Sequence, residues 1–248
     1  MESATMNVGK LVRPQSRSLE LQVTPVVYIV DDDVLVREFL DLLIDGAGWQ
    51  PMTFASAREF LSHPQACAPS CLILDIGLPD ISGLDLQQQI AERYHPPIIF
   101  LTGRGDVRTS VRAIKAGAFD FLTKPCNPQA LLDLVHVALA QDCARRNRLA
   151  ELDGLQRRLE SLTPRERDVL PLVVGGLLNK QAAAYLGISE ITLQIHRTNA
   201  MRKMRARSLA ELVRMADALE IPLATVRRQP RAIADRCPDH GRVSSARD

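Results

Sequence analysis

The sequence predicts an α/β domain built on a doubly wound parallel sheet, followed by a helical linker and an all-α domain of four helices. Two observations lead to this prediction. In the first half, short apolar runs that end in polar residues alternate with helical patterns, and in the second half capping residues mark four helices. The length of 248 residues and the hydrophobic content of 46% allow each of two domains to bury a core.

Polar residues follow four of the apolar runs, which we expect to be strands. The run 26–30 leads to Asp31, Asp32 and Asp33, 71–74 to Asp75, 98–101 to Thr102, and 119–122 to Lys124. Because the carboxyl ends of parallel strands lie on one edge of a sheet, we expect these polar groups to meet there. An aspartyl-phosphate site requires such groups: carboxylates hold Mg²⁺, an aspartate acts as nucleophile, and lysine and threonine bind phosphoryl oxygens.

Helices are expected between these strands and after them. The patterns predict helices over 34–45, 57–62 and 106–116, the last ending at Gly117. A further helix begins near Pro128 and can extend to Ser161, because residues 129–161 contain no proline and one glycine. Its leucines at 152, 155, 159 and 162 fit either a short coiled-coil seam or a helix packed on its own domains.

Capping residues divide the second half into four helices. Thr163 and Glu166 form a capping box with Pro164 in the first turn, and Ser208 with Glu211 forms another. Between them we expect one helix over 179–186, ended by Gly187, and one from the Ser189 cap to about residue 204. These two helices and their tight turn form a helix-turn-helix.

The helix after Ser189 has an apolar face and a polar face. Leu193, Ala200, Met201 and Met204 recur at helical spacing and should face the core. The DNA-binding residues that we expect are Gln194, Ile195, Arg197, Thr198, Asn199, Arg202 and Lys203, with Asn179 and Lys180 of the preceding helix on the DNA backbone. Polar groups for base edges and cations for phosphates suit a helix in a major groove, although a basic helical face is also typical of an ordinary solvated surface.

Charge is divided unevenly between the two halves. Residues 24–142 carry 8 basic and 15 acidic side chains, a net charge of −7, whereas residues 156–218 carry 11 basic and 6 acidic, a net charge of +5. The overall charge of +2 conceals this difference. An acidic first half suits a domain that collects Mg²⁺, and a basic second half suits one that meets phosphates.

The order and spacing of the polar residues over about 25–142 resemble the receiver domain of two-component response regulators. The resemblance implies a flavodoxin-like fold with five parallel strands. It also implies a role for each position: Asp75 as phosphoacceptor, Asp31, Asp32, Asp75 and the carbonyl of Gly77 as Mg²⁺ ligands, Thr102 and Phe121 as switch residues, Lys124 as phosphate-binding base and Pro125 as a cis proline. Two positions depart from the family: Gly77 replaces a residue with a side chain, and Cys126 replaces a common phenylalanine.

The second half resembles the LuxR-type helix-turn-helix over about 156–218. The resemblance rests on Leu162-Thr-Pro-Arg-Glu-Arg, Gly176-Leu-Leu-Asn-Lys-Gln, Leu186-Gly-Ile-Ser, Met201-Arg-Lys-Met and Arg207-Ser-Leu-Ala-Glu-Leu-Val. Ile191 and Gln194 stand where the family commonly has lysines, and Arg205 stands at a frequent glycine. We therefore expect DNA binding with an altered or weaker operator preference, in which Gln194 can pair with adenine.

Together the resemblances imply a FixJ-like response regulator of the NarL/FixJ class. Such a protein takes its phosphoryl group from a sensor histidine kinase, forms a homodimer on phosphorylation, binds promoter DNA and acts on transcription with RNA polymerase, with activation as the expected outcome. We expect no enzymatic activity. One alternative is an aspartate-nucleophile, Mg²⁺-dependent phosphatase, although that class needs a second aspartate at the position of Gly77. Another is a DNA-binding regulator that works without phosphorylation.

Composition also favours a cytoplasmic protein. The five cysteines form no CxxC pair and are expected to be free thiols, and no apolar stretch is long enough for membrane insertion. The expected domains are a flexible tail over 1–23, the receiver over 24–142, a helical linker over 143–160, the helix-turn-helix domain over 161–218 and a flexible tail over 219–248.

Overall fold

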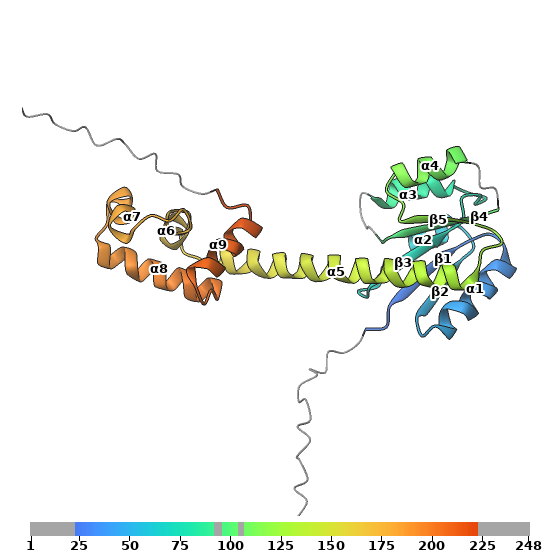
Figure 1. Ribbon diagram of the computed structural model, residues 1–248, viewed down its shortest axis with the longest axis horizontal. Coiled ribbons are helices and arrows are strands. Elements are labelled where there is room, and N and C mark those ends of the chain that lie inside the picture. Colours follow the sequence, from blue (N-terminus) through green and yellow to red (C-terminus); the bar gives the residue numbers. More distant parts are fainter. Residues whose placement is uncertain (1–22, 92–95, 104–106, 223–248) are drawn as a thin grey trace, which may run out of the picture. The chain divides into compact units, whose positions relative to one another are not determined.

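The computed structural model describes residues 23–91, 96–103 and 107–222 (Figure 1). The chain divides into two compact units, one up to Ala150 and one from Glu151. The tails expected over 1–23 and 219–248 lie outside the described residues, except for residue 23 and residues 219–222. In the described part of the chain, no helix is both long and apolar enough to cross a membrane.

The first unit is built on a five-stranded parallel sheet, which confirms the predicted fold class. Its strands, in the spatial order β2-β1-β3-β4-β5, are β1 (Val26–Val30), β2 (Gln50–Phe54), β3 (Ser70–Leu74), β4 (Ile98–Thr102) and β5 (Asp120–Thr123). Every residue of β1, β3 and β4 is buried, because helices cover both faces of the sheet. The near-continuous apolar sequences of these strands follow from that burial.

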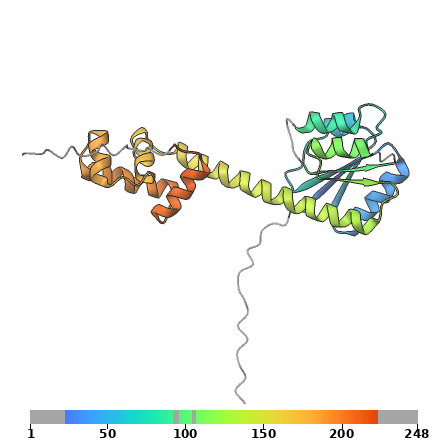
Figure 2. The same cartoon turned by 45° about the horizontal axis from the view of Figure 1, so that its top comes forward.

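Helices cover the two faces of the sheet in separate groups (Figure 2). The helices of this unit are α1 (Val34–Gly46), α2 (Ala57–Ser62), α3 (Gly83–Ala91), α4 (Val107–Lys115) and the first part of α5 (Pro128–Glu160). Side chains of α2, α3 and α4 pack on one face with Tyr28 and Val30, whereas those of α1 and α5 pack on the other with Val27 and Ile29. The alternation along β1 is the period of two that a strand requires.

The start of α3 lies tightly against the loop that follows β3. A Cβ atom on Gly83 would come within 2.3 Å of the carbonyl oxygen of Asp75, so a larger residue cannot stand there without moving backbone. The backbone N–H of Gly83 also donates to the carbonyl of Ile76 at 3.0 Å. Gly83 therefore lets α3 fix the loop that begins at Asp75.

A buried carboxylate anchors α5 to the opposite end of β3. Asp142 is fully buried and accepts a hydrogen bond from the backbone N–H of Ser70 at 2.9 Å. Its two oxygens also accept from Arg145 and Arg146, each at 2.6 Å. The ion pairs satisfy a charge that would otherwise be costly to bury.

The second unit is helical, as predicted. Besides the end of α5 it contains α6 (Pro164–Val174), α7 (Asn179–Leu186), α8 (Glu190–Met204) and α9 (Leu209–Ala218). The Thr163–Glu166 capping box is present, and Gly187 ends α7 in the left-handed conformation with φ of 67°. Leu162 belongs to the core of this unit and Leu159 packs against it, so these two leucines of the linker repeat have intradomain partners.

Candidate phosphoacceptor and DNA-binding sites

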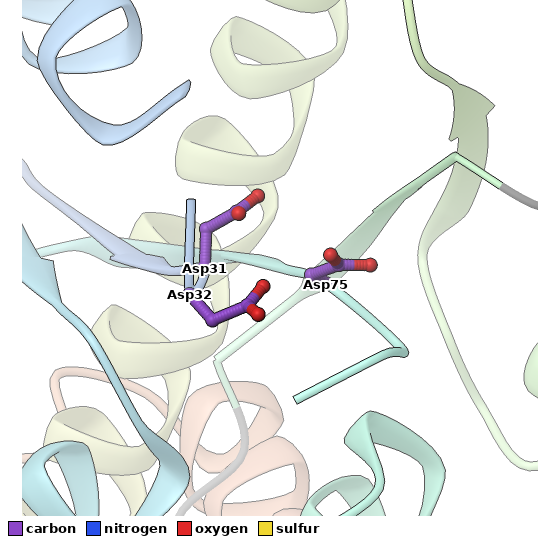
Figure 3. Close-up of side chains that lie close together, drawn as sticks. All are labelled: Asp31, Asp32 and Asp75. Atoms are coloured by element: carbon purple, nitrogen blue, oxygen red, sulfur yellow. The ribbon is translucent and has the colours of Figure 1, made fainter. Parts of the chain in front are cut away.

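Three carboxylates gather at the carboxyl edge of the sheet (Figure 3). β1 and β3 are neighbours in register, with Val30 opposite Leu74, so the residues that follow them emerge side by side. Oxygen atoms of Asp31, Asp32 and Asp75 lie within 4.8 Å of one another. Asp31 and Asp75 are buried, whereas Asp32 is exposed, so the cluster opens to solvent on one side.

Lys124 completes this cluster from the loop after β5. Its Nζ donates to Asp31 Oδ2 at 2.5 Å and to Asp75 Oδ2 at 3.0 Å. The peptide bond between Lys124 and Pro125 is cis, as the family resemblance implied. The structure thus joins one cation to two of the three predicted carboxylates, although the residues come from distant parts of the chain.

Burial and hydrogen bonds shift the pKa of both an acid and a base in this cluster. Burial raises the pKa of Asp31 above its usual value of 3.8, and hydrogen bonds from Lys124 and the Asp33 backbone offset this only in part. Burial alone would lower the pKa of Lys124, but hydrogen bonds to Asp31 and Asp75 outweigh it and raise that pKa. For Asp31 the negative charge of Asp75 adds to the effect of burial, whereas for Lys124 the negative charges of Asp31 and Asp75 favour the protonated form.

The remaining predicted residues of this site lie on neighbouring elements. Thr102 ends β4 and is buried, and its carbonyl accepts a hydrogen bond from the Lys124 backbone at 2.8 Å. Phe121 lies on β5, opposite Phe100 in register, and packs half-buried against the core. Gly77 is exposed, and its N–H donates to Asp75 Oδ1 at 3.2 Å.

Two further residues hold the loops of the site, and the sequence did not single them out. Arg37, on α1, donates to the carbonyl oxygens of Asp31 at 2.7 Å and Asp32 at 2.9 Å and so fixes the turn that carries both acids. Asp80 accepts from the backbone N–H groups of Arg58 at 2.9 Å and Ala57 at 3.3 Å, which ties the loop after Asp75 to α2. Arg37 stands four residues after Asp33 and Asp80 follows Pro79, and neither spacing reveals a contact across the fold.

The predicted DNA-binding residues lie mostly on one exposed side of α7 and α8. Lys180, Gln194, Ile195, Thr198 and Arg202 are exposed, and Asn179, Arg197 and Asn199 are half-buried. Leu193, Ala200 and Met204 are buried on the other side of α8, and Met201 packs against the core, as the periodicity predicted. The helix therefore presents its polar face to solvent.

Lys203, one of the predicted DNA-binding residues, has partners inside the domain. Its Nζ donates to Glu166 Oε2 at 2.7 Å and to the carbonyl of Ser161 at 3.2 Å. The Glu166 side chain is 5% exposed and that of Lys203 is 29% exposed. The ammonium group thus compensates a buried carboxylate on α6, whereas the DNA contact expected of Lys203 stays a prediction.

Comparisons with known proteins identify both domains. A model of the response regulator receiver domain matches residues 27–136, and a model of bacterial regulatory proteins of the luxR family matches residues 160–216. Nodulation protein W of Bradyrhizobium diazoefficiens is 46% identical over 210 residues, which cover 84% of this chain and 92% of that protein. Transcriptional regulatory protein FixJ of the same species is 37% identical over 191 residues, which cover 77% of this chain and 93% of FixJ.

A solved structure of similar organisation is that of response regulator StyR. It is 44% identical to this chain, with a TM-score of 0.73, and the match covers 79% of this chain and 99% of StyR. The fold and the matched domains thus define a response regulator with a receiver and a luxR-type DNA-binding domain. The chain belongs to the FixJ-like response regulators, a family of DNA-binding transcriptional regulators, which confirms the resemblance seen in the sequence.

Proposed function

We propose that Asp75 accepts a phosphoryl group from a sensor histidine kinase and that this phosphorylation controls binding to promoter DNA. The observation that carries the proposal is the contact of Lys124 with both Asp31 and Asp75 at the sheet edge. A carboxylate oxygen of Asp75 attacks phosphorus while the bond from phosphorus to the donor nitrogen breaks. Lys124 then binds a phosphoryl oxygen as a point charge, and the Thr102 hydroxyl donates to another.

The oxygen atoms of the acidic cluster fit a hard divalent cation. Asp31, Asp32, Asp75 and the carbonyl of Gly77 would hold Mg²⁺, which accepts several carboxylate and carbonyl ligands together with water. When bound, the metal supplies positive charge that offsets the repulsion between the carboxylates and an incoming phosphoryl group. The exposed side of Asp32 leaves this cluster open to a phosphoryl donor.

The surface beside the cluster suits a protein as phosphoryl donor. Helix α1 exposes Leu35 by 70%, Phe39 by 47% and Leu42 by 74%, an unusual amount of apolar surface for one helix. A groove of about 510 Å³ lies between α1 and the loop 124–126, lined by Phe39, Lys124 and Cys126 among others. This apolar surface next to Asp75 supports docking of a kinase domain there.

The output that we propose is activation of transcription by a phosphorylated homodimer in the cytoplasm. Val111 and Ile114 on α4 are 45% and 46% exposed, and such apolar side chains support pairing of two receivers through this part of the domain. A dimer brings two copies of α8 to half-sites about one helical turn apart, which raises affinity beyond that of one domain. RNA polymerase is the partner through which a bound activator acts.

The proposal is tested by labelling the full chain with acetyl phosphate and Mg²⁺. We expect Asp75→Asn to abolish incorporation while the fold persists, because an amide has nearly the same shape but is not nucleophilic. Asp85→Asn is the matched control, since it neutralises an exposed carboxylate on α3 that lies outside the acidic cluster. Labelling of Asp75→Asn at the wild-type level would refute the assignment.

Beryllofluoride, which mimics the phosphoryl group, separates the alternatives. With Mg²⁺ it should convert the wild-type chain to a dimer and increase its affinity for DNA, and it should change neither property of Asp75→Asn. Equal DNA binding by both forms would favour a regulator that works without phosphorylation. Rapid hydrolysis of phosphate esters would favour the phosphatase alternative, which the matched families do not support.

A further inference from the structure

A hydrogen-bonded chain of three side chains connects α7 and α8 at the surface expected to meet DNA. Arg197 Nη1 donates to Asn179 Oδ1 at 2.8 Å, and Asn179 Nδ2 donates to Gln194 Oε1 at 2.5 Å. Arg197 and Asn179 are half-buried, whereas Gln194 is exposed at the end of the chain. The series therefore runs from the interior of the domain towards solvent.

Arg197 determines the orientation of both amides in this chain. A guanidinium group has donors and no acceptor, so it contacts the oxygen of Asn179 and never its nitrogen. The nitrogen of Asn179 then faces Gln194, and because that nitrogen is a donor, Gln194 must turn its oxygen towards it. The Nε2 group of Gln194 is consequently directed away from Asn179.

The surroundings leave this Nε2 group available to a ligand. It has no hydrogen-bond partner among the residues that the structure describes. One turn away on the same face of α8, Ile191 is apolar and 76% exposed, and Thr198 donates its hydroxyl to the Gln194 carbonyl at 2.9 Å. The third such neighbour, Glu190, forms no hydrogen bond to Gln194 in the described part of the chain. A donor whose orientation is already fixed can form a directional bond to a ligand at a smaller cost in side-chain entropy.

We propose that Arg197 and Asn179 are positioning residues that fix Gln194 as a hydrogen-bond donor to the N7 atom of a purine in the major groove. N7 is an acceptor in both adenine and guanine, and its position makes it accessible from that groove. The inference rests on the proposed DNA-binding function. It also changes the role expected for Arg197, which acts through Gln194 instead of contacting DNA itself.

The first test replaces purines by 7-deazapurines, which lack the N7 acceptor. Sites are selected from random duplexes with the beryllofluoride-treated full chain, and each purine of the selected site is then replaced singly. We expect replacement of one purine in each half-site to lower the affinity of the protein for the duplex about fivefold. This factor corresponds to one hydrogen bond of about 1 kcal/mol, because about 1.4 kcal/mol changes affinity tenfold. Failure to select any site would overturn the proposed function, whereas a selected site with no sensitive purine would overturn this inference.

Variants of the protein show whether the orientation of the Gln194 amide causes the sensitivity to 7-deazapurine. Asn179→Asp removes the donor that faces Gln194, so the amide should reverse and the fivefold sensitivity to 7-deazapurine should disappear. Arg197→Met should also weaken that sensitivity, and Arg197→Lys, which keeps a donor, should restore it in part. Gln181→Glu adds the same charge to α7 as Asn179→Asp, but residue 181 is not one of the three hydrogen-bonded side chains. This variant should therefore still lose fivefold in affinity when the purine is replaced by 7-deazapurine.

A purely structural role would lower affinity for all DNA alike and leave the sensitivity to N7 unchanged. If Asn179→Asp and Arg197→Met bound more weakly but still lost fivefold at the same purine, the positioning role would be wrong. If neither variant folded, Gln194→Glu would serve instead: a carboxylate cannot donate, so sensitivity at that purine should be lost. Its persistence in Gln194→Glu would overturn the proposal.

Discussion

Replacing Lys203 by methionine should destabilise the DNA-binding domain. Glu166 Oε2 accepts hydrogen bonds from Lys203 Nζ and from the backbone N–H of Thr163, the latter at 2.8 Å. The substitution keeps a long side chain but removes the first of these two donors. Removing one partner of a fully buried ion pair costs about 3–5 kcal/mol. Because the Lys203 side chain is 29% exposed and water can replace part of the interaction, we expect about 2 kcal/mol.

The two domains can be followed separately in a urea titration of the full chain. The single tryptophan, Trp49, lies in the receiver, so its fluorescence reports that domain, whereas far-ultraviolet circular dichroism reports helices of both. With a slope of about 1 kcal/mol per molar for a small domain, Lys203→Met should lower the urea midpoint of the second domain by about 2 M. The midpoint of the Trp49 signal should not change, which provides an internal control.

A double-mutant cycle identifies the interaction responsible. Glutamine can replace Glu166 in a capping box without charge, so in the Glu166→Gln background Lys203→Met should cost less than about 0.5 kcal/mol. The reasoning would be refuted if Lys203→Met left the urea midpoint unchanged and instead reduced the slope of log affinity for DNA against log salt by about one, the mark of a lost phosphate contact.

The same ion pair predicts how stability depends on pH. Burial alone would raise the pKa of Glu166, but hydrogen bonds from Lys203 and Thr163 outweigh it and lower that pKa below the usual value of 4.5. Since the folded state binds this proton less tightly than the unfolded state, its stabilising contribution is complete above pH 4.5 and is lost as the pH falls through the folded pKa. Glu166→Gln should remove this part of the acid sensitivity from the unfolding midpoint of the second domain.

Three further variants test other parts of the chain. Asp32→Ala should weaken Mg²⁺ binding by at least about tenfold, as judged by a titration that follows Trp49 fluorescence or, failing a signal there, by calorimetry. Thr102→Ala should still accept a phosphoryl group on Asp75 but should not dimerise, and light scattering of the phosphorylated variant at the wild-type dimer mass would contradict the switch role. Arg205→Gly should stabilise the second domain by about 1 kcal/mol in a urea titration, because Arg205 has φ of 59° and glycine adopts this conformation without steric cost.

The strands that could be predicted from the sequence are those that are fully buried, because a fully buried strand has a continuous apolar sequence. β1, β3 and β4 lie inside the sheet and are buried along their whole length, and their predicted positions agree with the structure. β2 lies at the edge of the sheet, is largely exposed or half-buried and contains Pro51, so its sequence has no such run. Its existence followed from the family resemblance and not from the local pattern.

The meeting of side chains at the ends of parallel strands could be predicted from the sequence, because the topology of the sheet alone places these ends at one edge. Asp31, Asp75 and Lys124 meet at the carboxyl edge, where the apolar runs ended. Arg37 could not be found in this way, since its contacts with the carbonyls of Asp31 and Asp32 depend on the direction of one side chain. Its position on α1 gives no sequence signal for that direction.

The DNA-binding helix shows why a list of exposed polar types does not determine what each residue does. Sequence spacing placed Arg197 and Lys203 among the expected DNA contacts, yet each forms a hydrogen bond to a side chain of another helix, Asn179 in one case and Glu166 in the other. Those partners lie 18 and 37 residues away, beyond the reach of a helical period. We therefore expect each of these cations to contribute to DNA binding through the group that it orients or stabilises, so that the specificity of α8 would depend on the interior of the domain as well as on its exposed face.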